Sequence, residues 1–291
     1  MNIRRAGYAA VFVFLFLFAS CGYTPVEKAF TISGDAYRQA VMDGSSIRIL
    51  NWNIHKEGNQ KPWRDDFLRI VAEKKPHIIT FQEARLETGF RSLFDEDLRI
   101  GWAFSPNTFQ EKYDAYCGVL TASHYRPDVV QAMLSSGFEP ITRTPKAALF
   151  TRYDLGPDNS PLLVVNVHGI NFKIGLDDFQ DQLIEIFDRI ADHHGPVVLA
   201  GDFNTWRERR LAYLAEMAAG AGLVPVDFSP ETDWIESLSD NPLDHIFYSQ
   251  ALLAPKTGTS DVLEEVQTSD HRPLYVELTL KRQAGYQPSL N

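Results

Sequence analysis

The chain has 291 residues, of which 44% are hydrophobic, and a formal net charge of −10. These values allow a sizeable buried core. No long Pro-, Gly- or Ser-rich linker and no internal repeat interrupts the sequence. Their absence argues against several linked domains. An acidic surface repels polyanions, so the charge also counts against a protein dedicated to binding nucleic acid.

The amino-terminal residues have the layout of an export signal. Arg4 and Arg5 precede an apolar core at residues 9–19, and a core this short is more typical of a signal than of a membrane span. Residues 18–21 (FASC) resemble a bacterial lipobox, in which the cysteine is lipidated after cleavage. We therefore predict a lipid-anchored protein of the bacterial cell envelope, attached to the membrane through Cys21. An ordinary signal peptide or an uncleaved anchor would export the globular part as well.

Cysteine usage agrees with an exported fold that has no disulfide. The chain has two cysteines, and lipidation of Cys21 leaves Cys117 without a partner, so we expect Cys117 to be a small core residue. Without the two signal arginines, 26 basic residues remain against 38 acidic ones, and the net charge of the mature chain is −12.

The first part of the globular chain alternates strand and helix patterns. A short helix is expected at residues 35–41, and residues 47–54 alternate apolar with other side chains as a strand does. Residues 63–75 place their apolar side chains on one helical face, and residues 77–81 form a buried strand.

The middle of the chain is richer in strands. Strands are expected at residues 118–121, 147–150 and 162–167. Residues 177–194 form the best-defined helix of the sequence, because apolar residues share one face, two acids open the helix and two histidines close it.

The last third of the chain continues the alternation. Residues 196–200 (PVVLA) form a buried strand that leads directly into residues 201–204 (GDFN). A helix follows at 211–221, a short strand at 243–247 and a half-exposed terminal strand at 274–280.

Polar side chains recur where these strands begin or end. Each of them alone is more common as a turn, cap or solvated residue. If the strands share sheets, however, their ends can meet at one edge, where a rigid scaffold often carries a catalytic site. The oxygen-rich set has no cysteine and suits Mg²⁺ or Mn²⁺ better than a structural zinc. Its members are Asn53, Glu83, His168, Asp202, Asn204, Asp244, Asp270 and His271.

Six short motifs resemble, in order and spacing, the endonuclease/exonuclease/phosphatase superfamily, also called DNase I-like. The resemblance extends from about residue 47 to residue 280. Each motif is weak alone, but six in the right order are specific together. The motifs are NWNI at 51–54, QE at 82–83, NVH at 166–168, GDFN at 201–204, LDHI at 243–246 and SDHRP at 269–273.

The resemblance implies an α/β fold, a four-layer α/β sandwich in which two packed mixed β-sheets are flanked by helices. The strand and helix patterns are compatible with it, but they do not separate it from a doubly wound fold. The expected organisation is a lipoprotein signal peptide at 1–20, a tether and amino-terminal segment at 21–46, the family domain at 47–281 and a tail at 282–291.

For the metal and the attacking water, the resemblance implies the following roles. Glu83 is the principal ligand of Mg²⁺ or Mn²⁺, with Asn53 beside it and Asp270 completing or supporting the site. Asp202 orients and deprotonates the attacking water. Asn204 holds the phosphate or that water.

For the phosphate, the resemblance implies a set of imidazole and amide contacts. His271 contacts a non-bridging oxygen, and Asp244 is hydrogen-bonded to its ring and fixes its orientation. His168 stabilises the phosphate or assists the leaving group. Asn171 is a further substrate contact.

The favoured hypothesis is a divalent-metal-dependent phosphoesterase that acts outside the cytoplasm, as a monomer, on a nucleic acid, a nucleotide, a phospholipid headgroup or an inositol phosphate. Net charge and the lipid anchor favour a small or lipid-borne phosphate. One alternative is an extracytoplasmic DNA or RNA endonuclease, for which Arg207, Arg209 and Arg210 are the candidate basic strip. The other is a catalytically silent surface lipoprotein that binds a partner.

Overall fold

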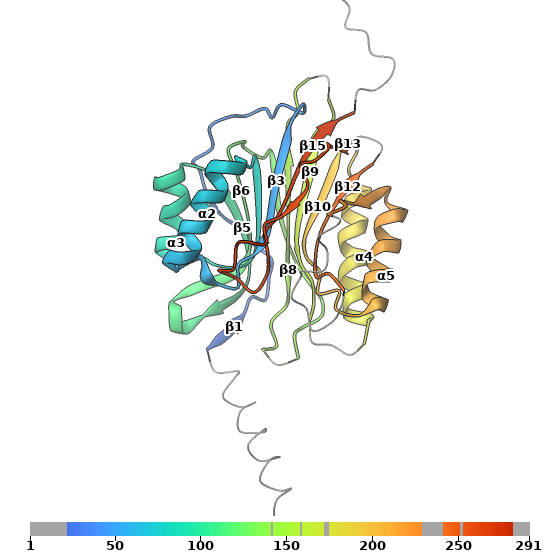
Figure 1. The fold of residues 1–291 in the computed structure, drawn as a ribbon. Coiled ribbons are helices and arrows are strands. Elements are labelled where there is room, and N and C mark those ends of the chain that lie inside the picture. Colours follow the sequence, from blue (N-terminus) through green and yellow to red (C-terminus); the bar gives the residue numbers. More distant parts are fainter. Residues whose placement is uncertain are drawn as a thin grey trace, which may run out of the picture.

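The computed structural model describes residues 22–281, with the exception of residues 141, 158, 172–174, 229–240 and 251–252. Within this part of the chain, two β-sheets pack face to face and helices cover the outer face of each sheet, which gives four layers (Figure 1). The predicted four-layer α/β sandwich is confirmed. The predicted signal peptide, Cys21 and the tail at 282–291 lie outside the described residues.

The larger sheet contains the amino-terminal strands together with the last strand. Among the described residues it has nine strands, in the order β1-β5-β6-β4-β3-β15-β13, with β2 paired to β5 and β14 paired to β15. The sheet is mixed, because β3 and β4 are parallel and the other pairs are antiparallel. Its strands are β1 (Tyr23–Pro25), β2 (Ile32–Gly34), β3 (Ile47–Asn53), β4 (Ile78–Arg85), β5 (Gly101–Gln110), β6 (Ala115–Ser123), β13 (Leu253–Pro255), β14 (Asp261–Val262) and β15 (Leu274–Leu280).

The smaller sheet is also mixed. Its order in the described part of the chain is β11-β12-β10-β9-β8-β7, and β9 and β10 are its parallel pair. Its strands are β7 (Val129–Leu134), β8 (Ala147–Tyr153), β9 (Leu162–His168), β10 (Val197–Asp202), β11 (Leu223–Pro225) and β12 (Asp244–Ser249).

Helices α2 and α3 cover the larger sheet, and α4 and α5 cover the smaller one (Figure 1). α4 begins with Asp177 and Asp178, whose carboxylates suit the positive end of the helix dipole. No helix within the described ranges combines the length and the hydropathy that crossing a bilayer requires. The helices are η1 (Glu57–Asn59), α2 (Lys61–Lys74), α3 (Thr88–Ser92), the π-helix η2 (Leu93–Leu98), η3 (Glu111–Tyr113), α4 (Asp177–Ala191) and α5 (Glu208–Gly220).

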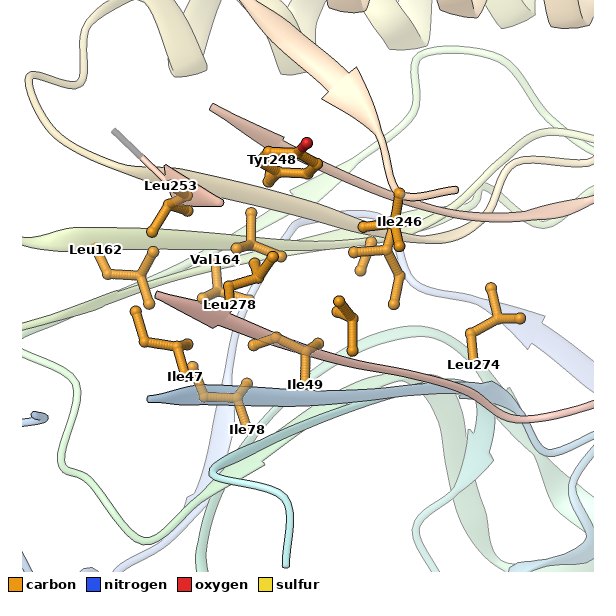
Figure 2. Packing of buried hydrophobic residues seen from close by; sticks show 14 of the residues in the cluster. Ile47, Ile49, Ile78, Leu162, Val164, Ile246, Tyr248, Leu253, Leu274 and Leu278 are labelled. Atoms are coloured by element: carbon orange, nitrogen blue, oxygen red, sulfur yellow. The ribbon is translucent and has the colours of Figure 1, made fainter. Parts of the chain in front are cut away.

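The central strands are buried on both faces, which explains their nearly continuous apolar sequences. Along β3, Ile47 and Ile49 lie in the core between the sheets, whereas Leu50 and Trp52 pack with the helices α2 and α3. Figure 2 shows Ile47 and Ile49 across from Val164 of the opposite sheet. Because side chains alternate along a strand, this pattern fixes which face of β3 meets the smaller sheet.

A buried amide network joins the two sheets beneath their shared edge. Gln82 Nε2 donates to Asn51 Oδ1 at 2.9 Å within the larger sheet and to Asn166 Oδ1 at 2.8 Å in the smaller sheet. Asn166 Nδ2 donates in turn to the carbonyl oxygens of Phe81 and Leu120. Since buried amides need such partners, the network specifies how the sheets align.

The predicted strands and long helices are present, although α4 ends at Ala191, before the two histidines that were expected to close it. The predicted helix at 35–41 is wrong. This segment runs along the fold in extended form, where Gln39 bridges to Tyr125 and Val41 to Asp154. Pairing with these neighbours satisfies the backbone better than a short isolated helix would, because a helix of two turns is marginal without tertiary packing.

Gly201 in β10 has no room for a side chain. A Cβ at this position would lie 2.0 Å from the carbonyl oxygen of Val167 on the neighbouring strand. We predict that Gly201→Ala lowers the free energy of unfolding by about 1–3 kcal/mol, because backbone atoms must move apart. Denaturant titration measures the loss.

The matched control for this prediction is Gly220→Ala. Gly220 ends α5, and a Cβ there meets no atom within 4 Å. We expect this variant to be as stable as the wild type or slightly more stable, because alanine favours a helix. An equal loss of stability in both variants would contradict the steric explanation.

Candidate active site

The order of the smaller sheet brings three predicted site residues to one edge. β9 and β10 run parallel, with His168 opposite Asp202. β12 runs antiparallel to β10, so Asp244 at its start is also opposite Asp202. Two strand ends and one strand start therefore meet at the same place.

The larger sheet supplies the facing groups. Asn53 ends β3, and because β15 is antiparallel to β3, the loop before β15 lies at the same end. Trp52 Nε1 donates to the carbonyl oxygen of His271 at 3.0 Å, and Ser269 Oγ donates to that of Asn53 at 2.7 Å. Between the sheets, Asn53 Nδ2 donates to Asp202 Oδ2 at 2.9 Å. The two edges are thus held together by hydrogen bonds.

Glu83 reaches the site through an irregularity of β4. The pairing of β4 with β6 shifts register between Phe81 and Ala84, and Glu83 has a φ of 51°. A bulge of this kind redirects a side chain, and Glu83 Oε1 lies 3.9 Å from His168 Nε2. The strand expected to end at Phe81 continues through the bulge to Arg85.

Five of the predicted residues form one continuous group, the acid–imidazole cluster, which consists of Glu83, His168, Asp202, Asp244 and His271. Asp202 Oδ2 lies 3.6 Å from His168 Nε2 and 4.0 Å from His271 Nε2. His271 Nδ1 lies 2.5 Å from Asp244 Oδ2. These distances are short enough for one small group to contact several members at once.

Asp244 keeps the imidazole ring of His271 protonated. Burial lowers the pKa of His271, but the charge and hydrogen bond of Asp244, with the charges of Asp202 and Asp270, raise it to about 10. The ring is therefore protonated at neutral pH, and its Nε2 lies beside Asp202. An imidazolium held in this way can oppose negative charge on a neighbouring group.

Asp202 is a buried carboxylate of the cluster and has the environment of a base. Burial raises its pKa, although the charge of His271 opposes the shift. Its Oδ1 accepts a hydrogen bond from the backbone N–H of Asn204 at 2.9 Å. A carboxylate with a raised pKa accepts a proton more readily than one with an ordinary pKa.

His168 is neutral, unlike His271. Burial, together with the charges of Lys146, Lys56 and His271, lowers the pKa of His168 well below its usual value. Lys146 Nζ lies 2.9 Å from His168 Nε2, at hydrogen-bond distance. The positive charge next to His168 therefore belongs to Lys146.

Asp270 lies at the edge of the site and pairs with His55. Asp270 Oδ2 is 2.9 Å from His55 Nδ1, and both side chains are about half exposed. Burial raises the pKa of Asp270, but the hydrogen bond from His55 and the charge of His271 outweigh it and lower the pKa to about 2. Asp270 is therefore an ionised oxygen donor at neutral pH.

Lys56 is a site residue that the sequence analysis missed. It forms an ion pair with Glu83, and both side chains are about one quarter exposed. Burial lowers the pKa of Lys56. Lys56 and the preceding His55 have φ angles of 66° and 44°, and this tight left-handed turn brings the ammonium group back onto β4.

The donor chemistry of this edge fits a hard divalent cation. The predicted ligands Glu83, Asn53 and Asp270 offer carboxylate and amide oxygens, which Mg²⁺ and Mn²⁺ prefer. Among the described residues, no group of three or more His, Cys, Asp or Glu is gathered closely enough to hold a metal. Because Lys56 already neutralises Glu83, a divalent ion must compete with this ammonium group.

We predict that Lys56→Met tightens Mg²⁺ binding about tenfold, because it removes a positive charge from Glu83. Calorimetric titration with MgCl₂ measures the affinity without any substrate. Lys61→Met is the matched control, since the Lys61 side chain is 83% exposed and pairs with Asp65. Equal affinities in the wild type and Lys56→Met would contradict the competition.

The two predicted amide contacts occupy different surroundings. Asn204 lies at the cluster, where its backbone N–H binds Asp202 and its Nδ2 donates to the carbonyl oxygen of Gly169 at 3.0 Å. The side-chain oxygen of Asn171 instead accepts a hydrogen bond from Trp206 Nε1 at 3.0 Å. The structure thus places Asn204 against the predicted base and Asn171 against an indole ring.

The prediction that Arg210 belongs to a basic surface strip after residues 201–204 (GDFN) is wrong. This side chain is fully buried, and its Nη1 donates to the carbonyl oxygens of Ile170 and Asn204. Buried carbonyl groups need a donor, and the guanidinium supplies several. Arg207 and Arg209 are exposed, so two of the three arginines lie at the surface.

Left-handed backbone conformations are concentrated at the site. Glu83, Asn204, His55 and Lys56 all have φ between 44° and 66°. Such conformations cost of order 1 kcal/mol for residues other than glycine, and they persist where the surroundings enforce them. Here they direct polar side chains toward the shared edge.

Lys146 and Glu139 were also missed by the sequence analysis. Lys146 precedes β8, and its Nζ lies 3.5 Å from Glu139 Oε1 as well as 2.9 Å from His168 Nε2. Glu139 is 5% exposed. The sequence could have pointed to Lys146, because this lysine directly precedes a strand. It could not have pointed to Glu139, whose position depends on how the loop between β7 and β8 folds.

Comparison with known proteins identifies relatives along the whole described domain. The Endonuclease/Exonuclease/phosphatase family model matches residues 50–271. A UPF0294 protein of Vibrio vulnificus strain CMCP6 is 33% identical over 94% of this chain and 95% of its own length. A UPF0294 protein of Vibrio cholerae, El Tor Inaba N16961, is 34% identical over 82% of this chain and 79% of its own length.

Solved structures share the fold at lower sequence identity. The endonuclease/exonuclease/phosphatase from Beutenbergia cavernae has a TM-score of 0.61 and 17% identity, over 81% of this chain and 72% of that one. The human Nocturnin catalytic domain with bound sulfate has a TM-score of 0.56 and 17% identity, over 87% and 97%. Members of this superfamily are generally hydrolases of phosphoester bonds and commonly use divalent metals such as Mg²⁺. The chain belongs to the endonuclease/exonuclease/phosphatase family.

Proposed function

We propose that this protein is a metal-dependent phosphoesterase that cleaves a phosphodiester or phosphomonoester by in-line attack of a water molecule. Family membership supports a hydrolase of the phosphoesterase or nuclease type. The observation that carries the finer proposal is the pairing of a base with a cation, because Asp202 Oδ2 and His271 Nε2 lie 4.0 Å apart in the cluster. Phosphoryl transfer needs mainly positioning and charge neutralisation, and this pair offers both.

Asp202 takes a proton from the attacking water. The oxygen of the water forms a bond to phosphorus, the bond between phosphorus and the alcohol oxygen breaks, and the departing alkoxide takes up a proton. The products are an alcohol and a phosphate that carries the oxygen of the water. General-base help of this kind is worth roughly two to four powers of ten in rate. Asn204, bound to Asp202, orients the water or the phosphate.

His271 contacts a non-bridging phosphate oxygen and opposes the charge that develops there. Asp244 keeps this ring protonated and oriented through the bond at 2.5 Å. His168 is neutral, so it assists the phosphate or the leaving group as a hydrogen-bonding partner, with Lys146 providing the charge beside it. Asn171 is the outer substrate contact in this proposal.

Mg²⁺ or Mn²⁺ is the proposed cofactor, held by Glu83 with Asn53 and Asp270. When bound, a divalent ion supplies a positive charge that polarises a phosphoryl oxygen. The oxygen-donor chemistry of these residues supports the assignment.

The proposed location is the bacterial cell envelope, outside the cytoplasm, with a lipid on Cys21 as the membrane anchor and a monomer as the active form. The nuclease alternative has less support. The mature charge of −12 disfavours polyanions, and the burial of Arg210 removes one of the three arginines on which that alternative depends.

A hydrolysis screen tests the proposal. The purified mature domain is assayed with and without Mg²⁺ on plasmid DNA, nucleotides, phospholipids and inositol phosphates, and the Asp202→Ala protein serves as the inactive control. We expect Mg²⁺-dependent release of phosphate or of an alcohol from at least one class. Equal rates in the wild type and Asp202→Ala would overturn the mechanism.

A further inference from the structure

A cavity of about 360 Å³ lies at the opposite end of the larger sheet from the acid–imidazole cluster. Arg48 near the start of β3 lines it, whereas Asn53 ends the same strand at the active site, so about 17 Å of extended chain separates the two places. The lining has three cations, Arg38, Arg48 and Lys75, and none of its described residues is acidic, although the chain carries a net charge of −10. We call it the basic pocket; its lining also includes His77, His124 and Tyr125.

Both arginines of the basic pocket are held in place by carbonyl oxygens at helix ends. Arg48 Nε donates to the carbonyl oxygen of Lys75 at 2.7 Å, at the carboxyl end of α2. Arg38 Nη2 and Nε donate to the carbonyl oxygens of Leu98 at 2.8 Å and Arg99 at 3.1 Å, at the end of η2. Helix-end carbonyl groups need such donors, so part of the basic character stabilises the fold.

The helix ends do not use all the donors of these cations. A guanidinium group has five N–H donors. Besides the bond from Nε, Arg48 donates from Nη1 to Ser46 Oγ at 2.9 Å and from Nη2 to His77 Nε2, which leaves one N–H on each Nη. Arg38 and Lys75 are exposed and Arg48 is half-buried, so solvent-borne ligands can reach the pocket. A guanidinium fixed in this way is suited to bind the oxygens of a phosphate or a carboxylate.

The three cations of the pocket form no ion pair with a carboxylate among the described residues. The acid opposite Arg48 in the sheet is Glu277. Its carboxylate accepts a hydrogen bond from Ser46 Oγ at 3.0 Å and pairs with Lys256 at 3.2 Å. Glu277 therefore approaches Arg48 through the hydroxyl group of Ser46, and the positive charge of the pocket is left largely uncompensated.

The two histidines of the pocket are neutral at neutral pH. Burial and the charge of Arg48 lower the pKa of His77 to about 4. Burial and the charge of Arg38 lower the pKa of His124. As a neutral ring, His77 accepts the hydrogen bond from Arg48 and orients its guanidinium group. The rings thus position the cations without adding to their mutual repulsion.

We propose that the basic pocket binds a phosphate group at a site distinct from the active site. The two anchored guanidinium groups donate to the phosphate oxygens, and the ammonium group of Lys75 adds a third charge at the mouth. A phosphate monoester dianion matches three cations better than a singly charged carboxylate does, because more charge is neutralised. The volume lies at the lower end of the range for ligand sites, which suits a compact group. This site goes beyond the proposed function and requires no catalysis.

An NMR titration of the histidine rings tests the inference, because it reports on each site separately. Inorganic phosphate is added to the purified protein, and chloride at the same ionic strength is the comparison. We expect phosphate to shift the ring signals of His77 and His124 along a saturable curve and chloride to leave them unchanged. Phosphate shifts confined to His168 and His271, or equal shifts with chloride, would overturn the second site.

Variants of the pocket sharpen this test. Lys75→Gln and Arg38→Gln are each expected to raise the Kd obtained from the His77 signal about tenfold, because one charge-assisted contact is lost. Arg48 binds the backbone carbonyl of Lys75, so Lys75→Gln preserves that bond and decides the question if Arg38→Gln does not fold. Lys61→Gln, at the other end of α2 and 83% exposed, is the matched control with an unchanged Kd. Equal Kd values in the wild type and Lys75→Gln contradict the assignment.

A vesicle experiment distinguishes a lipid headgroup from a free phosphate ester, since both carry the same group. The wild type and Lys75→Gln are sedimented with phosphatidylcholine vesicles that contain or lack phosphatidic acid. Weaker binding of Lys75→Gln to the phosphatidic acid vesicles alone supports the lipid source. Equal binding of both proteins overturns that source and leaves the free phosphate group as the ligand. None of these measurements needs turnover, so they stand apart from the hydrolysis screen.

Discussion

Replacing Asp202 with asparagine is expected to lower kcat/KM by roughly two to four powers of ten, which is the contribution of general-base catalysis. Asparagine has nearly the same shape but cannot take a proton from water. The hydrogen bonds that Asp202 receives from Asn53 and Asn204 show that its two oxygens are fixed in place. The amide can keep one of these bonds, so we expect a stability loss of about 1–3 kcal/mol without loss of the fold.

The matched control for this result is Asp188→Asn. Asp188 is an exposed residue of α4 on the outer side of the smaller sheet, and its replacement is expected to change neither activity nor stability. Circular dichroism establishes that both variants are folded before their rates are compared. Activity of Asp202→Asn close to that of the wild type would remove Asp202 from the role of base.

Asp244→Asn is expected to have the second largest effect, through the ionisation of His271. Asparagine still accepts a hydrogen bond from Nδ1 but carries no charge, so the pKa of His271 falls from about 10 toward its ordinary value. At mildly alkaline pH the ring is then neutral, and kcat/KM is expected to drop by about ten- to a hundredfold and to recover in acid. A pH–rate profile and an NMR titration of the ring follow the change, and identical profiles in variant and wild type would contradict it.

The same pair makes the stability of the fold depend on pH. The pKa of His271 in the folded state, about 10, lies above its value in the unfolded chain. Its contribution is therefore fully present below about pH 6.5 and is lost as the pH rises toward 10. We expect the free energy of unfolding of the wild type to fall by a few kcal/mol over this window, and the fall to be smaller in Asp244→Asn. Denaturant titrations at several pH values measure both curves.

The strand-end residues illustrate what the sequence could reveal. His168, Asp202 and Asp244 each stand at the boundary of an apolar run, and since those runs pair as adjacent strands, their side chains meet. The strand and helix patterns alone could not distinguish a four-layer sandwich from a doubly wound fold. The order of the motifs and the family resemblance favoured the sandwich.

Other parts of the site depend on tertiary packing. Lys56 and Glu83 meet because both residues adopt left-handed conformations that no hydrophobic pattern reveals. The ionisation of His168 follows from its burial and the nearby Lys146, and sequence alone gives neither. The failed helix at 35–41 has the same origin, since bridges to distant residues decided that conformation.

The left-handed backbone at Glu83 and Asn204 has a consequence for the evolution of the fold. Glycine would relieve the steric penalty at Glu83, whereas asparagine tolerates the left-handed conformation and Asn204 also donates a hydrogen bond to the carbonyl oxygen of Gly169. That position 83 retains a carboxylate is the trade-off expected where turnover is under selection. In relatives that have lost activity, position 83 should drift toward glycine sooner than position 204, which offers a way to tell working members from silent ones.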